Sequence, residues 1–392
     1  MRTQVGIVGA GPAGLMLSHL LHLYGIESAV IDIRSRESIE GTVRAGILEQ
    51  NTVDMMTNAG VDARMKREGI PHHGIELRFN GRGHRIDFTE LANGRGVMVY
   101  AQHEVLIDLI KQRINGDEGP LLFGVSDVSV SGITDGMPTI SFTQDGSRQQ
   151  IECDYVVGAD GSQTYCRFLI PDGKIRKDYF RQYPFAWFGI LAKAPPSSDE
   201  LIYTHHERGF ALISTRSPDV QRMYFQCDPD DSVENWSDDK IWNEFQTRVN
   251  GPGAEIKPGE IFQKDILQFR SFVCEPMQYG KLFLAGDAAH TVPPTGAKGL
   301  NLAMADVHVL ARAIGSYYAS KSVEYLDGYT ATALRRVWRA QHFSWWMTSM
   351  LHRFSDASDF DLQRQLAELD VITSSRQGSA LLAEQYVGYP LA

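Results

Sequence analysis

Three glycines near the start of the chain are spaced for binding a dinucleotide. Gly9, Gly11 and Gly14 lie between a short apolar run and a longer apolar stretch. Glycines at this spacing permit a tight turn and let a pyrophosphate approach the first turn of a helix. Asp32 follows 18 residues after Gly14, where a carboxylate can accept hydrogen bonds from ribose hydroxyls. The pattern predicts a site for FAD or NAD. A purely structural glycine turn, which needs no acid, is the alternative.

A second group of residues has the chemistry to bind a carboxylate. Ser214 and Arg216 are two residues apart in an expected strand, so both should face the same side. An arginine fork beside a hydroxyl suits a carboxylate, because bidentate hydrogen bonding fixes its orientation. Tyr224, in the next expected strand, offers a third donor. On residue types alone, an ordinary surface arginine explains this pattern as well.

The elements that must position the glycines form a strand, a helix and a second strand. Residues 5–8 are a short apolar strand, residues 15–24 have the pattern of a nearly buried helix, and residues 28–33 are the next strand. Gly25 is suited to end the helix in the left-handed conformation. Such a unit implies parallel strands in a doubly wound α/β sheet.

The middle of the chain has a different pattern. Alternating apolar residues predict a second, sheet-rich domain with antiparallel strands at 201–204, 210–214 and 223–227. Residues 281–285 form another short apolar strand, and the pattern becomes helical after Asn301. A late helix carries unusual apolar bulk at Trp345, Trp346, Met347, Met350 and Leu351.

Two later motifs distinguish between the dinucleotides. Asp160-Gly161 follows one expected strand, and Gly286-Asp287 follows another. Together with the three glycines they resemble the three-motif signature of the FAD-dependent aromatic hydroxylases. Longer stretches also resemble this family, so that the resemblance covers essentially the whole chain. They are residues 44–50, 200–203, 208–212, 286–290, 292–301, 343–349 and 386–388.

The resemblance implies a fold and an activity. The expected fold is α/β, with an FAD-binding Rossmann-like βαβ domain, a β-sheet substrate domain and C-terminal helices. The implied reaction converts 4-hydroxybenzoate to 3,4-dihydroxybenzoate with NADPH or NADH and O2, through a flavin C4a-hydroperoxide. The implied domains are FAD-binding at 1–73, 98–180 and 270–340, substrate-binding at 74–97 and 181–269, and a helical interface region at 341–392.

Residue by residue, the resemblance also implies the substrate pocket. Ser214, Arg216 and Tyr224 match carboxylate-binding positions. Tyr203 and Tyr386 match a pair of tyrosines that relays the phenol proton, a role that suits a hydroxyl because it both donates and accepts. The other matches are His72 at the surface end of the relay, the Pro294 carbonyl near the substrate hydroxyl, and Thr295 beside it.

The same resemblance implies which residues hold the cofactors. Backbone N–H groups at the start of the helix near Leu300 and Asn301 are expected to face the flavin, where the helix N-terminus favours negative charge. Arg44, together with Arg270, is also expected to meet the nicotinamide phosphates. The FAD-binding positions are Gly9, Gly11, Gly14, Asp32, Arg44, Gln102, Asp160, Asp287, Leu300 and Asn301.

The loop after Asp32 departs from the family pattern. Ile33 and Thr42 stand where the best-known members have arginine, and Ser38 stands where they have tyrosine. Arg34 and Arg36 could neutralise the 2′-phosphate of NADPH, and Glu37 would oppose them. We therefore expect weak discrimination between NADPH and NADH. No second glycine motif occurs, so no separate nicotinamide domain is expected.

Composition limits which partners and functions remain possible for this protein. A formal net charge of −10 argues against nucleic acid as a partner. The four cysteines have no metal or redox spacing and are expected to be reduced thiols in a cytoplasmic protein. We expect no metal and no membrane span, and the family resemblance implies a homodimer. The alternatives are hydroxylation of a related aromatic acid such as a 3-hydroxy- or aminobenzoate, a non-catalytic FAD-binding protein, and a flavin oxidase that yields only hydrogen peroxide.

Overall fold

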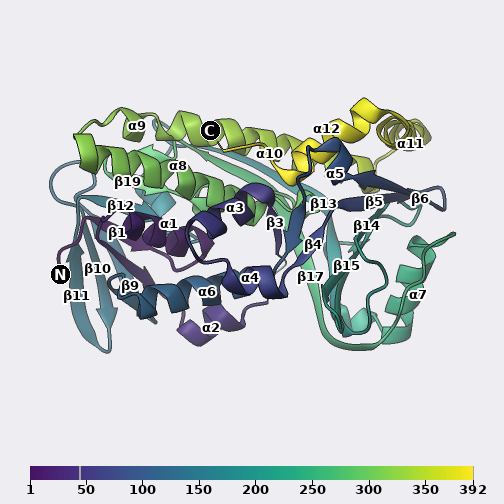
Figure 1. Cartoon of the computed structure of the whole chain (residues 1–392), viewed down its shortest axis with the longest axis horizontal. Helices are drawn as coiled ribbons and strands as arrows, with labels where there is room; N and C mark the ends of the chain where they lie inside the picture. Colours follow the sequence, from purple (N-terminus) through teal and green to yellow (C-terminus); the bar gives the residue numbers. More distant parts are fainter. Residues whose placement is uncertain (44–45, 392) are drawn as a thin grey trace.

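A mostly parallel sheet carries the glycine turn in the computed structural model, which describes residues 1–43 and 46–391 (Figure 1). Its order is β18-β19-β12-β1-β2-β8, and only β18 pairs antiparallel. This confirms the expected α/β fold. The strands are β1 (Val5–Val8), β2 (Ser28–Asp32), β8 (Leu121–Phe123), β12 (Tyr155–Gly158), β18 (Gln278–Tyr279) and β19 (Leu282–Leu284).

Helix α1 (Pro12–Leu23) begins earlier than the expected residue 15. Proline at the first helical position is favourable, because its fixed φ suits the helix and its missing N–H would have no partner there. Gly25 follows the helix with a φ of +70°, in the left-handed region as expected. The next strand, β2, ends at Asp32 rather than at residue 33, and Ile33 is exposed.

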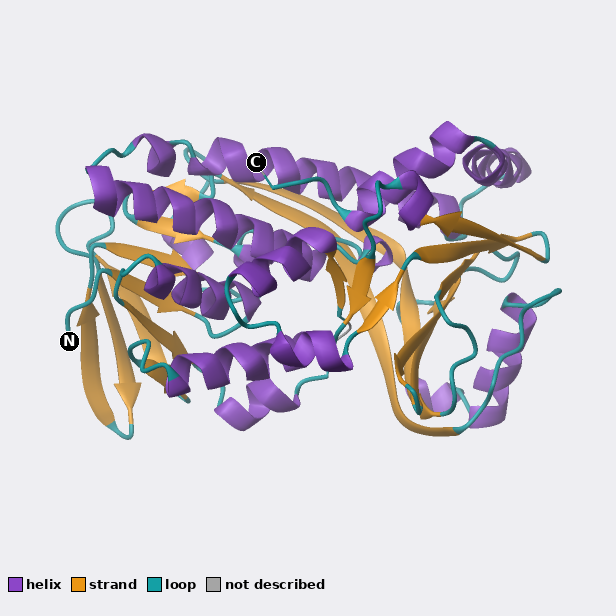
Figure 2. Cartoon of the chain, viewed as in Figure 1, coloured by secondary structure: helices purple, strands orange, loops and turns teal. Residues whose placement is uncertain are grey.

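Helices cover the parallel sheet, and a small antiparallel sheet lies beside it (Figure 2). The helix predicted after Asn301 is α8, which begins at Gly299. The covering elements are α1, α6 (Gln102–Asn115), α8 (Gly299–Ser320) and α10 (Tyr329–Leu351). The small sheet contains β9 (Ser126–Ser131), β10 (Thr139–Gln144) and β11 (Ser147–Glu152).

The second large sheet has eight strands in the order β20-β17-β13-β16-β15-β14-β5-β6. The three antiparallel strands expected from the sequence are confirmed as β14 (Leu201–Thr204), β15 (Ala211–Ser217) and β16 (Val220–Cys227). Two very long strands, β13 (Lys177–Lys193) and β17 (Glu260–Glu275), pair along most of their length. The others are β5 (Gly74–Phe79), β6 (Arg82–Asp87) and β20 (His290–Thr291).

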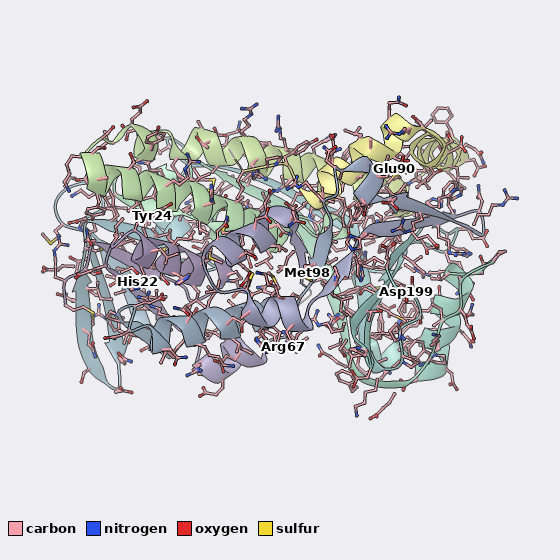
Figure 3. All side chains as sticks on the ribbon, in the orientation of Figure 1. His22, Tyr24, Arg67, Glu90, Met98 and Asp199 are labelled. Atoms are coloured by element: carbon pink, nitrogen blue, oxygen red, sulfur yellow. The ribbon has the colours of Figure 1, made fainter. Side chains whose placement is uncertain are left out.

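A fourth sheet lies between the parallel and the eight-stranded sheets, and Met98 of its central strand is labelled there in Figure 3. Its strands are β3 (Ile47–Glu49), β7 (Val97–Val99) and β4 (Ile70–His72). The remaining helices are α2 (Arg36–Gly41), α3 (Gln50–Asn58), α4 (Ala63–Glu68), α5 (Phe88–Leu91), α7 (Asp238–Arg248), α9 (Glu324–Asp327), α11 (Asp359–Ser374) and α12 (Arg376–Val387).

One hydrophobic core joins the eight-stranded sheet to the C-terminal helices. It includes Tyr203 and Tyr224 from the sheet, with Phe343, Met347 and Tyr386 from the helices. None of the described helices is long and apolar enough to cross a membrane. Within residues 1–43 and 46–391, no group of three or more His, Cys, Asp or Glu side chains could hold a metal ion. All four cysteines are free thiols.

His352 is fully buried among aromatic rings in this core. Its ring stacks on Phe210 and Phe185, with centroids 4.4 and 4.7 Å away. Trp187 Nε1 donates to His352 Nε2 over 2.7 Å, and His352 Nδ1 lies 3.0 Å from the Thr348 carbonyl. An acceptor nitrogen and a donor nitrogen describe the neutral ring. Burial lowers the pKa of His352 to about 3.

This burial predicts a specific loss of stability in acid. The pKa is lower in the folded state than the ~6.5 of an unfolded histidine, so the unfolded state binds the proton first and stability falls as pH drops below 6.5. Between pH 7 and pH 5 the expected loss from this one group is about 2 kcal/mol. Urea denaturation at both pH values should show a loss smaller by that amount in His352→Phe. The exposed control His22→Gln should behave as the wild type. An unchanged pH dependence in His352→Phe would contradict the assignment.

Candidate functional site

The structure requires glycine at Gly9, Gly11 and Gly14 for different reasons. Gly9 has a φ of +112°, and an added Cβ there would lie 2.2 Å from the Ala159 carbonyl oxygen. A Cβ on Gly14 would lie 1.9 Å from the Gly9 carbonyl oxygen. Both are therefore needed by the fold itself. A Cβ on Gly11 would approach no atom nearer than 4.0 Å. Gly11 therefore leaves open space at the N-terminus of α1, as close approach of a pyrophosphate requires.

The acidic motifs converge on the same edge of the parallel sheet. Strands β1, β12 and β19 pair in parallel, with Val8 beside Gly158 and Gly158 beside Leu284. The residues that follow these strands, Gly9, Asp160 and Asp287, therefore meet at the carboxyl ends of neighbouring strands. Crevices at this edge are where open α/β sheets bind their ligands.

The Asp32 carboxylate already accepts several hydrogen bonds from within the protein. Its carboxylate accepts hydrogen bonds from the backbone N–H groups of Ala10 (2.7 Å) and Arg34 (2.8 Å) and from the Arg34 guanidinium at 3.1 and 3.0 Å. These contacts occupy the four lone-pair positions of a carboxylate. The Arg34 side chain is 42% exposed. It can therefore swing away when a ribose hydroxyl approaches Asp32.

The loop arginines are thus engaged within the protein. Arg34 pairs with Asp32, whereas Arg36 Nε donates to Glu40 Oε1 over 2.7 Å. Glu37, the acid expected to oppose these cations, interacts electrostatically with Arg36, and Glu40 is a second acid that pairs with Arg36 directly. Asp160 is engaged as well, because its carboxylate accepts from the N–H groups of Tyr165 (2.8 Å) and Cys166 (3.0 Å).

The expected carboxylate-binding side chains lie on adjacent strands of the eight-stranded sheet. Ser214 of β15 is directly opposite Arg222 of β16, and Tyr203, Leu212 and Tyr224 lie opposite one another across three strands. The Ser214 hydroxyl donates to the Arg222 carbonyl over 2.6 Å. A hydroxyl has only one proton, so in this arrangement Ser214 can accept from a ligand and cannot donate to it.

Arg222, the second arginine of this pocket, was not predicted from the sequence. Arg222 is 7% exposed, donates from Nε to the Tyr224 hydroxyl (2.8 Å) and pairs through Nη2 with Asp265 (2.9 Å). Its buried Nη1 has no hydrogen-bond partner among the described residues. Burial and, next, the charge of Arg222 lower the pKa of Arg216 to about 10. Two neighbouring buried cations favour an anionic ligand. No sequence motif identified Arg222, because its burial depends on strand pairing.

The two tyrosines expected to move a proton do meet. The hydroxyls of Tyr203 (β14) and Tyr386 (α12) are 2.6 Å apart, although 183 residues separate them in the chain. Each side chain is 1% exposed. Burial raises the pKa of both hydroxyls, so both are neutral and each can donate and accept.

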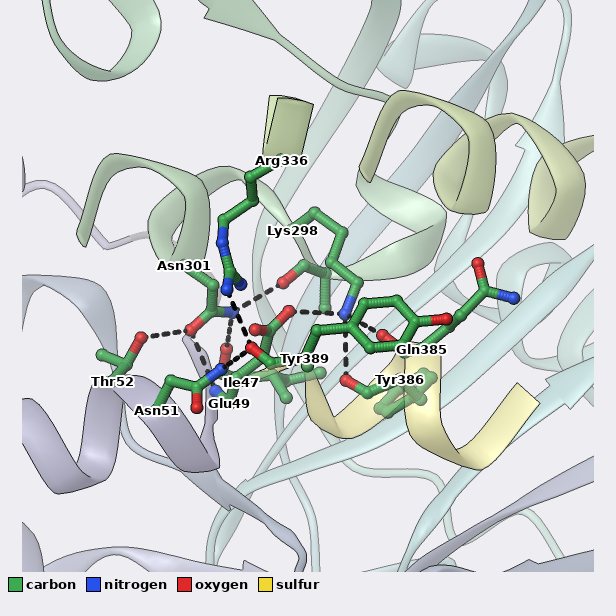
Figure 4. A network of polar contacts seen from close by, with 12 residues as sticks. Ile47, Glu49, Asn51, Thr52, Lys298, Asn301, Arg336, Gln385, Tyr386 and Tyr389 are labelled. Atoms are coloured by element: carbon green, nitrogen blue, oxygen red, sulfur yellow. Dashed lines mark hydrogen bonds and ion pairs between the residues drawn. The ribbon is translucent and has the colours of Figure 1, made fainter. Parts of the chain in front are cut away.

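A buried lysine fixes one member of this pair (Figure 4). Lys298 Nζ contacts Glu49 Oε1 at 2.5 Å and the carbonyl oxygens of Gln385 (2.6 Å) and Tyr386 (3.0 Å). The Asn301 side chain accepts from the Glu49 N–H over 2.9 Å. Sequence analysis missed the roles of Glu49 and Lys298, because only the tertiary fold brings their segments together.

The surroundings of His72 differ from what was expected, whereas those of Pro294 leave its expected role open. His72 is only 1% exposed, so it does not lie at the surface, and burial lowers its pKa. Neither of its ring nitrogens has a partner among the described residues. The Pro294 carbonyl accepts from Ala297 N–H over 2.9 Å, which leaves one lone pair for a ligand. Thr295 Oγ1 lies 2.9 Å from Thr348 Oγ1.

The other expected cofactor positions that the structure describes belong to α6, α8 and β17. Gln102 begins α6, and Leu300 and Asn301 are in the first turn of α8. Arg270 is exposed on β17. Arg44 lies outside the described residues.

Comparison with known proteins identifies the dinucleotide. A family described as an FAD binding domain matches residues 2–344. The chain belongs to this FAD-binding family. A p-hydroxybenzoate hydroxylase of Acinetobacter baylyi is 46% identical over 100% of this chain and 96% of that protein. A 3-(3-hydroxy-phenyl)propionate/3-hydroxycinnamic acid hydroxylase of Paraburkholderia xenovorans is 23% identical over 84% of this chain and 52% of that protein.

Solved structures share the fold of this FAD-binding protein. The p-nitrophenol 4-monooxygenase PnpA of Pseudomonas putida DLL-E4 superposes with a TM-score of 0.83, covers 99% of both chains and is 18% identical. The open position at Gly11 and the acids at the sheet edge fit an FAD molecule with its pyrophosphate at the N-terminus of α1.

The three glycines predict two different kinds of defect in FAD binding. Gly11→Ala should leave the melting temperature of the apoprotein unchanged, because its Cβ enters open space, and should weaken FAD binding at least tenfold by blocking the pyrophosphate. Gly14→Ala should lower the apoprotein's melting temperature, because its Cβ meets backbone. FAD titration and thermal denaturation of the apoprotein test both, with Gly41→Ala, where a Cβ also meets nothing within 4 Å, as the matched control. Normal FAD affinity in Gly11→Ala would contradict this assignment.

Proposed function

We propose that this protein is a flavin-dependent monooxygenase that converts 4-hydroxybenzoate to 3,4-dihydroxybenzoate. One O2 and one NAD(P)H are consumed, and one oxygen atom leaves as water. The observation that carries the proposal is the similarity to the A. baylyi p-hydroxybenzoate hydroxylase, 46% identical over the whole chain. The pairing of Tyr203 with Tyr386 and the two arginines of the pocket support it, because together they suit a ring with a carboxylate at one end and a phenol at the other.

The residues that hold FAD follow from the sheet edge. We assign the pyrophosphate to the turn at Gly9 and Gly11, a ribose to Asp32, and the flavin end to Asp287 and the backbone at Leu300 and Asn301. Gln102, Asp160 and Arg44 complete the set. Bound FAD supplies the redox chemistry, taking a hydride from NAD(P)H and reacting with O2, and the protein supplies position and electrostatics.

The carboxylate of the substrate is assigned to Arg216. Its guanidinium is desolvated and has Arg222 as a neighbour, so a bound carboxylate removes a repulsion as well as gaining hydrogen bonds. Tyr224 is held in place by Arg222 and lies on the same face. The Ser214 hydroxyl already donates its proton to the Arg222 carbonyl. It can therefore only accept a hydrogen bond from the substrate or form part of the pocket wall.

The phenol of the substrate is assigned to Tyr203. Hydroxylation requires an electron-rich ring, and removing the phenol proton makes the carbon beside it a better nucleophile. Tyr203 can accept that proton only as it passes its own to Tyr386, because both hydroxyls stay neutral. Before the proton moves to Tyr203, the single O–H of the phenol can instead donate to the free lone pair of the Pro294 carbonyl, next to Thr295. We propose that water links Tyr386 to His72, whose buried and unpartnered nitrogens suit a water-mediated relay.

The reductant is proposed to be either NADPH or NADH. Arg34 and Arg36, the two cations near a 2′-phosphate, have Asp32 and Glu40 beside them, whose negative charges remain nearby even when Arg34 moves away from Asp32. Little net positive charge therefore remains to select the phosphate. Arg270 and Arg44 are proposed to meet the phosphates common to both nucleotides.

The proposed assembly is a cytoplasmic homodimer through the region 341–392. Large apolar side chains on these helices are exposed, among them Trp345 (40%), Phe360 (75%) and Leu381 (49%). Exposed apolar groups of this kind mark contact surfaces. We keep the division into an FAD-binding part (1–73, 98–180 and 270–340) and a substrate-binding part (74–97 and 181–269) as part of the proposal.

Removing the Tyr203 hydroxyl should separate hydroxylation from reduction. Tyr203→Phe keeps the ring and its packing, so 4-hydroxybenzoate should still bind within a few-fold of the normal Kd. Product formed per NAD(P)H oxidised should fall at least tenfold, with hydrogen peroxide in its place. Tyr183→Phe removes a buried hydroxyl of the same core that bonds to Ser271 and is the matched control. Full yield of 3,4-dihydroxybenzoate in Tyr203→Phe would show that the phenol is activated in another way.

A further inference from the structure

A cavity of about 490 Å³ lies between helices α8 and α10 and residues 388–391. Residues of the Lys298 network, which Figure 4 shows together with Arg336 and Tyr389, form part of its lining. One face of α8 lines it at positions three and four apart, and one face of α10 does the same. The walls are mainly apolar and include Leu302, Ala305, Val309, Ala340 and Phe343.

Three arginines of α10 also line this cavity. They are Arg335, Arg336 and Arg339, and no carboxylate of the described residues forms an ion pair with any of them. Arg336 Nη2 donates to the carbonyl oxygens of Tyr389 (2.9 Å) and Pro390 (2.6 Å), and the Arg339 guanidinium lies 5.3 Å from the ring centre of Tyr389. Arg336 is half-buried, whereas Arg335 and Arg339 are exposed at the rim.

The two acids of the cavity, Glu49 and Asp306, offset part of the charge of Arg336, although each also has a partner of its own. Glu49 pairs with Lys298 at 2.5 Å, and Asp306 lies 2.7 Å from His290 Nε2 and accepts from Gly286 N–H. Among the described residues, the cavity therefore combines an apolar interior with a rim at which Arg335 and Arg339 form no ion pair. This occurs in a chain whose net charge is −10.

We propose that this cavity is a binding site for a medium-sized apolar carboxylate, separate from the aromatic substrate site. Its volume lies within the roughly 300–1,000 Å³ of typical small-molecule sites, which are mostly apolar with a few placed polar groups. The apolar part of the ligand fills the space between α8 and α10. Its carboxylate takes the N–H donors of Arg335, Arg336 and Arg339 that residues 389 and 390 leave available.

A ligand in this cavity would contact residues that also hold Tyr386 of the tyrosine pair in place. Lys298 and Gln385 line the cavity, and Lys298 holds the backbone of Tyr386. Residues 388–391 form one wall and would be held from both sides. A ligand that binds only the folded protein also raises its melting temperature by mass action.

Octanoate is the probe that tests this site. The FAD-loaded protein is titrated with octanoate by calorimetry in saturating 4-hydroxybenzoate, so that Arg216 and Arg222 are occupied. We expect one saturable site per chain. Arg335→Gln/Arg339→Gln should weaken octanoate binding at least tenfold, and Arg364→Gln/Arg376→Gln, which removes two exposed arginines elsewhere, should not. Octan-1-ol should bind at least tenfold more weakly than octanoate.

A second variant fills the cavity and keeps its charges. Val309→Trp should abolish octanoate binding, while FAD content and 4-hydroxybenzoate affinity stay normal. Equal binding of octanoate by the double arginine variant, equal binding of octan-1-ol, or no binding by the wild type would overturn the proposal. So would a change of oligomeric state in the double variant without a change in octanoate binding, because the arginines would then serve a subunit contact. If 4-hydroxybenzoate itself does not bind, the titration without it still decides this site.

Discussion

The buried ammonium group of Lys298 is the interaction on which the arrangement of the site depends. It is 4% exposed and bonds to partners 249, 87 and 88 residues away in the chain. Burial lowers its pKa, and Glu49 opposes that effect. Removing one partner of such a buried pair typically costs about 3–5 kcal/mol, because the other charge is left without compensation. Through Lys298, the start of α8 and strand β3 fix the end of α12, and with it Tyr386.

Two further constraints follow from this anchor. The first turn of α8 is held beside β3, where the Asn301 side chain bonds to the Glu49 N–H and the Ile47 carbonyl, and the helix N-terminus therefore has a fixed direction. The end of α12 is held over the eight-stranded sheet, where Tyr386 meets Tyr203. The proposed flavin end and the proposed phenol end of the pocket are thus set by one network, and Arg216 and Arg222 set the opposite end from the sheet alone.

The parts of the fold that local patterns determine were predictable. The glycine turn, α1 and β2 follow from apolar periodicity and from φ values that only glycine adopts easily, as Gly25 shows. Alternation predicted β14, β15 and β16. Strands β13 and β17, of 17 and 16 residues, were not predicted, because they gain stability from pairing with each other rather than from local sequence. The predicted and observed ends of elements differed by one to three residues, as where α1 begins at Pro12 and α8 at Gly299, earlier than predicted.

The residues of the site also divide into those that the sequence predicted and those that only the fold revealed. The resemblance supplied Tyr203 and Tyr386 by position, and the fold brings their hydroxyls together. Arg222 and Lys298 were missed because a buried cation has no sequence signature when its partners, Asp265 and Glu49, come from other elements. The expected surface position of His72 was wrong for a related reason: pairing of β4 with β7 buries it.

The central claim is that the arginines and the tyrosine pair of the pocket, with bound FAD, couple the reduction of O2 to hydroxylation of one position on the substrate ring. The most direct measurement is the yield of 3,4-dihydroxybenzoate per NAD(P)H oxidised by the purified FAD-loaded wild type, with and without 4-hydroxybenzoate, at saturating O2. We predict that 4-hydroxybenzoate strongly stimulates NAD(P)H oxidation and that the yield approaches one product per reductant. No stimulation, or stimulation that produces only hydrogen peroxide, would contradict this account.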